Sequence, residues 1–422
     1  MNGFRSACII SRPKENVKAA KIQGFFKWIG ISYVTLTSRE NDICKNLVLK
    51  ENRESLDVTI YLRENETVFY NWSSNPFRKV VEFNEKQNTT TEIVSSILNE
   101  LYKTVTEDHV DADNTVFGNL IEIYEKYDLA AELANINYSL RSHSDVVLKD
   151  YNEQRKKWID VINDLEKLQQ KAGENGEYLK HAFVYSKRKV NELCNLQSFA
   201  RTYSVFELLE EADEIYQYDK DFYEAECLKS KIALLDSEYQ LLSTLYLQGC
   251  IEQCPVAACR SFYYYRLGKQ YEGQGRKDRA IEVYEKAYKT NPANIRAIFK
   301  LGVHYINKKE LKLAEKYFSK ILELLGLINI QDEQMINQIN ELSAIELEYA
   351  SKSYILLIKI ARLDDQGIRY EKYLHEQAEK IANSLDGNLY LQKMYSDELQ
   401  RSRVKDCLQR KLSLDNIRRR FD

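Results

Sequence analysis

Three cysteines, Cys250, Cys254 and Cys259, form the densest group of side chains in the sequence that could bind a metal or form a disulfide. Their spacing lacks the C-x-x-C pairs that are typical of zinc ribbons and of thioredoxin-like redox sites, and no histidine lies nearby. Small apolar thiols are common in helix cores. We therefore interpret the three as buried, reduced cysteines, and we expect neither a metal nor a cofactor.

A second candidate for chemistry is the loop that carries Ser11, Arg12 and Lys14. It follows a short apolar run that predicts a strand, and an α/β sheet places its ligands at the ends of its strands. The sequence contains neither G-x-G-x-x-G nor G-x-x-x-x-G-K-[ST], the glycine-rich patterns that cradle phosphates. The loop is therefore a candidate ligand site, and a solvated loop is the alternative. No catalytic residue is identified, so a non-enzymatic protein is the favoured interpretation.

The last segment, from Arg401 to Asp422, carries eight basic and three acidic residues and a net charge of +5. Such a segment can bind the phosphates of a nucleic acid or an acidic protein. The candidate contact residues are Arg410, Lys411, Arg418, Arg419 and Arg420. The alternative is a solvated terminal helix that docks through its leucines. No aromatic residue precedes Phe421 in this run, which disfavours stacking on single-stranded nucleic acid.

Length and composition limit the kinds of fold that can position these residues. The chain has 422 residues, which is enough for two or three domains. It contains only 14 glycines and 4 prolines, and because these residues punctuate turns, long helices are favoured. The 61 basic residues are balanced by 64 acidic ones, so the whole chain has no general attraction for nucleic acid or anionic membranes. Neither a signal peptide nor a membrane span is evident, which predicts a soluble cytoplasmic protein.

Two copies of one residue pattern lie 34 residues apart in the second half of the chain. The first copy contains Tyr264, Leu267, Gly268, Tyr271, Gly275, Ala280, Tyr284, Ala287 and the pair Asn291-Pro292. The second copy contains Ile298, Leu301, Gly302, Tyr305, Ala314 and Phe318 at the corresponding positions. Small residues at these offsets allow two helices to approach closely, and the aromatic residues fill the space between hairpins.

This pattern resembles the tetratricopeptide repeat (TPR) family, whose helical hairpins repeat every 34 residues. The second copy departs from the family pattern at three positions: Lys309 replaces the turn glycine, Ile321 the small residue near the end, and Gly326 the terminal proline. The resemblance covers about residues 206–325 and implies an α-solenoid. Because at least three hairpins are needed to bury their faces, weaker copies are expected at about residues 206–239 and in the helices predicted near residues 349–361 and 373–385.

In the TPR family the first helix of each hairpin lines a concave groove through its second, fifth, ninth and twelfth positions. Carried over to this sequence, the resemblance implies a partner groove formed by Phe262, Tyr265, Lys269, Glu272, Arg296, Phe299, Val303 and Ile306. This mixture of aromatic, aliphatic and charged side chains suits an amphipathic helix or an extended peptide. It lacks the Lys and Asn pairing with which some members hold a C-terminal carboxylate. The alternative is that these side chains pack against a neighbouring helix of the same chain.

The first 110 residues have a different pattern, which predicts the order β-α-β-α-β-β-α. Strands are expected at about residues 7–11, 31–37, 58–62 and 68–72, with a further strand at 79–83. A helix carries Ile22, Phe25 and Ile29 on one face, and Thr89 with Glu92 forms a capping box before another helix. Flavodoxin-like, receiver-like, Toll/interleukin-receptor-like and thioredoxin-like arrangements all agree with this order. None of them supplies a function by itself.

The sequence therefore predicts a mainly α protein, a TPR-like α-solenoid preceded by a small α/β domain. We expect the α/β domain at residues 1–110, a helical connector at 111–205, repeats at 206–398 and a basic helix at 399–422. The favoured function is an interaction scaffold, sensor or adaptor that binds a protein or peptide. Two alternatives are a signalling or defence effector whose N-terminal domain handles a nucleotide, and nucleic-acid binding through the C-terminus. Partner identity and oligomeric state are left open, and no membrane association is expected.

Overall fold

The structure is a computed structural model. It describes residues 4–12, 15–37, 43–71, 78–84, 89–106, 112–133, 144–172, 176–328, 332–340, 342, 344–363 and 368–383. The chain divides into two compact units, residues 1–301 and 302–422. Lys14 of the predicted ligand loop and the entire predicted basic helix at residues 399–422 lie outside the described residues.

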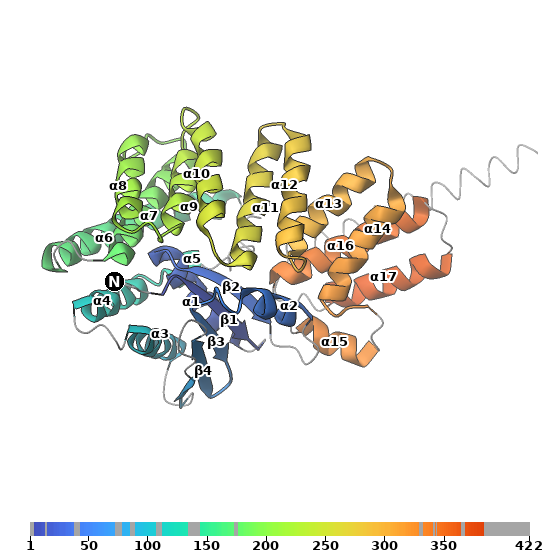
Figure 1. The fold of residues 1–422 in the computed structure, drawn as a ribbon, viewed down its shortest axis with the longest axis horizontal. Helices are drawn as coiled ribbons and strands as arrows, with labels where there is room; N and C mark the ends of the chain where they lie inside the picture. The colour runs from blue at the N-terminus through green and yellow to red at the C-terminus, as the bar shows by residue number, and fades with distance from the viewer. Residues whose placement is uncertain are drawn as a thin grey trace, which may run out of the picture. The chain divides into compact units, whose positions relative to one another are not determined.

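The first unit begins with a five-stranded sheet in the order β2-β1-β3-β4-β5 (Figure 1). The strands are β1 (Ser6–Ser11), β2 (Ser32–Thr37), β3 (Val58–Leu62), β4 (Glu66–Asn71) and β5 (Arg78–Glu82). β1 pairs in parallel with β2 and β3, whereas β3, β4 and β5 form an antiparallel meander. The predicted elements are present in the predicted order, and the further strand expected at residues 79–83 is β5, which lies between β4 and the last helix of that order. The antiparallel β4 and β5 exclude the fully parallel sheet of flavodoxin-like and receiver-like domains.

One face of the sheet packs against α1 (Asn16–Ile29) and α3 (Thr90–Thr106). The side chains of Ala7 and Ile9 from β1 and of Phe69 from β4 are buried there, together with Phe25 of α1 and Ile97 of α3. Alternate residues of a strand point to opposite faces, so Cys8 faces away from α1. This apolar layer fixes the sheet on the two helices.

Side chains hold the starts of two helices. The predicted capping box begins α3: the Thr89 N–H donates to the Glu92 carboxylate at 2.7 Å, and the Glu92 N–H donates to the Thr89 hydroxyl at 3.3 Å. Asn52 ends α2 (Ile43–Asn52) and accepts a hydrogen bond from the Ala258 N–H at 3.0 Å. Because Ala258 lies in the first turn of a later helix, the end of α2 fixes the start of that helix.

Four helices follow the sheet: α4 (Ala112–Lys126), α5 (Ala130–Leu133), α6 (Ser144–Ala172) and α7 (Glu177–Leu196). Helix α6 ends at Ala172 and α7 begins at Glu177; residues 173–175 of the turn predicted between them lie outside the described residues. Helix α7 packs against both α6 and α1. Gly30 ends α1 with a φ of 85°, and a Cβ atom there would lie 2.6 Å from the Phe222 ring. A single hydrophobic core runs from Phe4 to Leu235, and the predicted domain limits at residues 110, 205 and 398 remain proposals.

The first unit continues with α8 (Val205–Tyr218), α9 (Glu224–Ala233), α10 (Gln240–Gln253), α11 (Ala257–Gly273) and α12 (Lys277–Thr290). Each of these helices packs against the next one along the chain, and the row is seen at the top of Figure 1. The weak hairpin predicted near residues 206–239 is therefore present as α8 and α9. The fold class, helical repeats preceded by a small α/β region, is confirmed.

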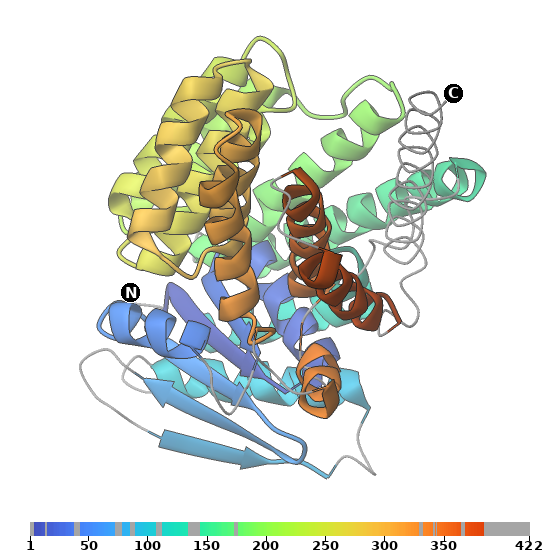
Figure 2. The ribbon, with the colours of Figure 1, turned by 90° about the vertical axis from the view of Figure 1, so that its right-hand side faces the viewer.

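Helix α13 (Ile295–Asn307) contains the division between the two units. In the second unit, α14 (Leu311–Leu324) packs against α16 (Ala344–Leu363), and α16 packs against α17 (Ile368–Asn383); these helices are orange to red in Figure 2. A short helix, α15 (Asp332–Asn340), precedes α16. The helices predicted downstream of the tandem repeats are thus confirmed. Among the described residues, no helix is long and apolar enough to cross a membrane.

Candidate partner-binding surface

Close contact between α11 and α12 depends on small residues at the positions that the repeat pattern reserves for them. A Cβ atom at Gly268 would lie 2.4 Å from a ring carbon of Tyr284, and the Tyr284 side chain is fully buried. Ala280 and Ala287 are also fully buried. The hairpin therefore forms a close-packed support for the side chains on its outer surface.

The inner face of α11 is anchored to the sheet by a buried polar cluster. The Ser32 hydroxyl of β2 donates to the Glu224 carboxylate of α9 at 2.6 Å and lies 2.9 Å from the Tyr263 hydroxyl of α11. Tyr263 also donates to Glu224. Burial alone would raise the pKa of Glu224, but the charge of Lys231 and the hydrogen bonds from Ser32 and Tyr263 lower it. Glu224 is thereby held as a carboxylate that joins a strand to two helices.

A second set of contacts joins α11 to α9 and α10. An Arg266 guanidinium N–H donates to the Cys227 sulfur at 2.9 Å, and the Gln270 amide donates to the Ser243 hydroxyl at 2.8 Å. A hydrogen bond with Cys250 is the largest cause that lowers the pKa of the Cys227 thiol, to about 6, and the nearby Lys231 and Arg266 charges act in the same direction. These contacts fix the rotation of α11 about its axis.

The outer face of α11 carries an aromatic pair that a cation covers. The rings of Phe262 and Tyr265 are stacked with their centroids 6.2 Å apart. The Arg296 guanidinium of α13 lies 5.0 Å from the Phe262 centroid and 6.0 Å from that of Tyr265. Phe262 is 37% exposed although it is a large apolar residue. We call Phe262, Tyr265 and Arg296 the aromatic cluster.

About two turns further along α11 than Tyr265, Glu272 connects the helix to α13. Its carboxylate accepts hydrogen bonds from the Lys300 ammonium at 2.8 and 3.0 Å, and Lys269 lies 3.6 Å away. Partial burial alone would raise the pKa of Glu272, but the hydrogen bond and charge of Lys300, with a smaller contribution from Lys269, lower it. The aromatic cluster is thus followed by an ion-paired group on the same helix.

The structure places six of the eight predicted groove residues in the first unit. Phe262 and Lys269 are exposed, whereas Tyr265, Glu272, Arg296 and Phe299 are partly buried. Val303 and Ile306 are partly buried on the part of α13 that belongs to the second unit. Contacts of Arg296 with Phe262 and Tyr265 bring residues of both predicted repeats together. Their role in binding a partner stays a prediction.

The structure describes two of the three residues of the predicted ligand loop. Ser11 is buried at the end of β1 and Arg12 is exposed.

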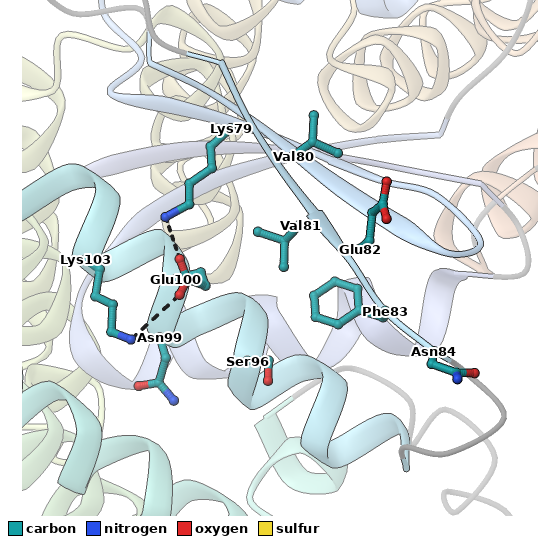
Figure 3. A pocket seen from close by; sticks show the side chains of 10 residues that line it. All are labelled: Lys79, Val80, Val81, Glu82, Phe83, Asn84, Ser96, Asn99, Glu100 and Lys103. Carbon is teal, nitrogen blue, oxygen red and sulfur yellow. Dashed lines mark ion pairs between the residues drawn. The ribbon is translucent and has the colours of Figure 1, made fainter.

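A pocket of about 720 Å³ lies between β5 and α3, away from this loop (Figure 3). Inside it the Glu100 carboxylate pairs with Lys79 at 2.5 Å and with Lys103 at 3.6 Å. Within the described residues, no group of three or more His, Cys, Asp or Glu side chains is arranged to hold a metal ion.

Sequence reasoning identified the aromatic residues of α11 but missed the contacts that anchor them. The three members of the Ser32–Glu224–Tyr263 cluster come from β2, α9 and α11, and no local pattern links residues so far apart. Cys250, Cys254 and Cys259 are buried, as predicted. Cys227 was missed as the neighbour of Cys250 because it lies in the preceding helix.

Comparison with known proteins identifies the repeat. Residues 261–294 match the tetratricopeptide repeat family. This segment is a tetratricopeptide repeat. A TPR repeat-containing protein of Methanocaldococcus jannaschii is 32% identical over 127 residues, which are 30% of this chain and 19% of that protein. The chain therefore spans about a fifth of that relative's length, and residues 1–110 are not assigned to a family.

Several solved structures are similar to parts of this chain at low TM-scores. A crystal structure of MamA is 26% identical, covers 42% of this chain and 92% of its own, and has a TM-score of 0.29. BtubC from P. vanneervenii is 13% identical, covers 56% of this chain and 92% of its own, and has a TM-score of 0.40. Yeast Tom70 is 12% identical over 75% of this chain and 80% of its own, with a TM-score of 0.26.

Proposed function

We propose that this chain is a non-enzymatic interaction scaffold that binds a helical or extended segment of a partner protein along α11 and the part of α13 that belongs to the first unit, residues 295–301. The observation that carries the proposal is the aromatic cluster, in which Arg296 covers the stacked rings of Phe262 and Tyr265. Aromatic residues and arginine dominate the binding energy of protein interfaces. Phe262 and Tyr265 lie in the tetratricopeptide repeat at residues 261–294, which agrees with this role.

The anchoring of α11 supports binding at this surface. The Ser32–Glu224–Tyr263 cluster and the Arg266–Cys227 contact hold the inner face of the helix, so the rings on its outer face are ordered before a partner arrives. Binding costs less entropy when the contact side chains are already ordered. The surface can therefore bind a partner without rearrangement of the helix.

The chemistry of the aromatic cluster also indicates what the partner carries. The N–H groups of a guanidinium lie in its own plane and point outward from its edge. They can therefore donate to a carboxylate while the face of the guanidinium stacks on aromatic rings. The rings offer an apolar surface of the kind that packs with leucine or an aromatic residue. We therefore expect a partner segment in which an acidic residue flanks a large apolar one.

The test is capture of partners by the full chain from its native cell, with and without nuclease. We expect a stoichiometric protein that survives nuclease and is lost with the double change Tyr265→Ala and Phe299→Ala. A matched control removes the exposed side chains of Tyr218 on α8 and Leu241 on α10, and this variant should retain the partner. Circular dichroism establishes that all three chains stay helical.

Three results separate this proposal from its alternatives. Retention of the same partner by the double variant would show that α11 and α13 are not the binding surface. Recovery of nucleic acid alone would favour binding through the basic segment at residues 399–422. Recovery of a nucleotide bound by a chain that lacks a protein partner would favour the effector hypothesis for the N-terminal region.

A further inference from the structure

Strand β5 is at one edge of the sheet, and within the described part of the chain no other strand pairs with its outer side. The Phe83 N–H donates to the Asn65 carbonyl at 2.9 Å, which continues the β4–β5 register in which Val81 pairs with Thr67. Because the backbone groups of an antiparallel strand point alternately to its two sides, Lys79, Val81 and Phe83 direct theirs to β4. The N–H and C=O groups of Arg78, Val80 and Glu82 point to the free edge.

The side chains of this edge follow the same alternation. All five residues from Lys79 to Phe83 contribute atoms to the pocket wall. The side chains of Lys79, Val81 and Phe83 point toward α3, whereas those of Val80 and Glu82 point away from it (Figure 3). Arg78, Val80 and Glu82 are all exposed on the face of the sheet opposite α3, and Val80 is 41% exposed. One face of β5 therefore presents a cation, an apolar residue and an anion in line.

We propose that β5 pairs with β5 of a second copy of this chain, antiparallel and with Val80 opposite Val80 of the partner copy. In this register Arg78 of each copy lies opposite Glu82 of the other. The outward backbone groups then form three hydrogen-bonded pairs: Arg78 with Glu82 of the other copy, Val80 with Val80, and Glu82 with Arg78. Each such pair exchanges two hydrogen bonds, which gives about six in all. The interface is two-fold symmetric, as closed homodimers require.

Charge complementarity selects a second copy as the occupant of this edge. Opposite charges on directly facing residues of an antiparallel pair are stabilising, and like charges are destabilising. In the proposed register both facing pairs are of opposite charge, and the two Val80 side chains meet between them. Glu82 makes no ion pair within the part of the chain that the structure describes. Edge strands that avoid pairing are commonly short or carry a proline, a bulge or charged side chains. β5 is short and charged, but it has no proline and a regular register, and its outward charges Arg78 and Glu82 are complementary in the proposed pairing.

The pocket beside β5 adds to the fit. It lies between β5 and α3, with Val81 and Phe83 in its wall. On this side of the joined sheet, Lys79 of one copy lies opposite Val81 of the other. The stem of Lys79 reaches Glu100, with which its ammonium pairs at 2.5 Å, so no unpaired charge is introduced between the copies.

The test is the mass of the full chain in solution, measured by sedimentation equilibrium at low ionic strength. The natural chain, of 49.6 kDa, should rise toward twice that mass with concentration. Arg78→Glu places two glutamates opposite each other, and Glu82→Arg places two arginines opposite each other. Each change alone should weaken dimerisation about tenfold or more. The double variant Arg78→Glu with Glu82→Arg should dimerise again.

Mixing the two single variants gives the sharpest result. The Arg78→Glu chain has glutamate at positions 78 and 82, and the Glu82→Arg chain has arginine at both. Opposite charges then face each other between the two variants, so the mixture should form heterodimers although neither variant forms homodimers. Val80→Pro is a further probe, because it removes an outward N–H and leaves the β4–β5 ladder intact; it should yield a monomer with unchanged circular dichroism.

The proposal is overturned by a natural chain that stays monomeric up to about 100 µM, far above the micromolar range of weak specific complexes. It is equally overturned by a dimer that both charge reversals leave unchanged, since another surface would then join the copies. Binding of an extended peptide from a different protein at β5 of a monomeric chain would replace the second copy as the occupant.

Discussion

The hairpins α11–α12 and α13–α14 follow the same 34-residue pattern, and they differ in which parts of it they keep. Both keep the glycine that faces an aromatic ring: a Cβ atom would lie 2.4 Å from Tyr284 at Gly268 and 2.7 Å from Phe318 at Gly302. The turn and the end of the second helix vary. The difference indicates that close contact between the helices of a hairpin constrains the sequence more than its turn does.

The turns show how the second hairpin adapts. Gly275 of the first hairpin has a φ of 75°, and Lys309 at the corresponding position of the second has a φ of 63°. The backbone conformation is therefore the same with and without glycine. Ala287 of the first hairpin and Ile321 of the second are both fully buried, so a larger side chain fills the corresponding place.

Gly268→Ala should have the largest effect among the changes that probe this comparison. The added Cβ atom would overlap the fully buried Tyr284 ring, and overpacking of this kind costs about 2 to 3 kcal/mol in the free energy of unfolding. Tryptophan fluorescence during urea unfolding measures it, since Trp28, Trp72 and Trp158, the only tryptophans, all lie in residues 1–301.

The control for this change is Gly273→Ala in the same helix. A Cβ atom at Gly273 meets nothing within 4 Å, so the variant should gain a few tenths of a kcal/mol from the higher helix propensity of alanine. Equal effects of the two substitutions would show that Gly268 is not required for close contact between the helices.

Lys309→Gly and Gly275→Lys exchange the turn residues of the two hairpins. A left-handed conformation costs a residue with a side chain about 1 kcal/mol relative to glycine, so the first change should stabilise the second unit and the second should destabilise the first unit by that amount. Far-UV circular dichroism follows the helices of both units, whereas tryptophan fluorescence follows the first. Lys309→Gly should shift the urea transition seen by circular dichroism, and a shift to lower urea concentration would contradict the strain argument.

The smallest effect is expected for the Glu272–Lys300 contact, which links α11 to the start of α13. The pKa of Glu272 is lower in the folded chain than its usual value of 4.5. As the pH falls, the Glu272 carboxylate is therefore protonated in the unfolded chain before it is protonated in the folded chain. The contact therefore stabilises the fold above pH 4.5, and this contribution is lost as the pH falls through the lowered pKa.

Lys300→Met should consequently reduce the loss of stability between pH 5 and pH 3.5, measured as the urea midpoint of tryptophan fluorescence. Lys286→Met, at an exposed position of α12, is the matched control and should leave the acid sensitivity unchanged. Identical pH profiles for the two variants would mean that Lys300 does not lower the pKa of Glu272.

Much of the fold could be predicted because its signals are local. The 34-residue spacing of Gly268 and Gly302 identified the hairpins, and Thr89 with Glu92 identified the start of α3. The alternation of apolar residues identified the strands, including the further strand predicted at residues 79–83. Strand direction in β4 and β5 could not be predicted, because it is set by which neighbour each strand pairs with.

The anchoring of the candidate site could not be predicted for the same reason. Ser32 and Glu224 lie 192 residues apart, and Ser32 and Tyr263 lie 231 apart. Polar residues at these positions look like ordinary solvated side chains in the sequence. Arg5 is a further case: it lies 4.7 Å from the centroid of the Phe222 ring and pairs with Asp219, and nothing near either residue in the sequence indicates the other.

The core that runs from Phe4 to Leu235 has a consequence for how the protein is made. The sheet is synthesised first, but Phe222, which packs on Gly30, leaves the ribosome much later. At 5 to 20 residues per second, roughly 10 to 50 s separate the first strand from the completed core. During that interval the apolar residues of α1 lack part of their packing partners, so we expect the nascent chain to bind chaperones near the ribosome exit.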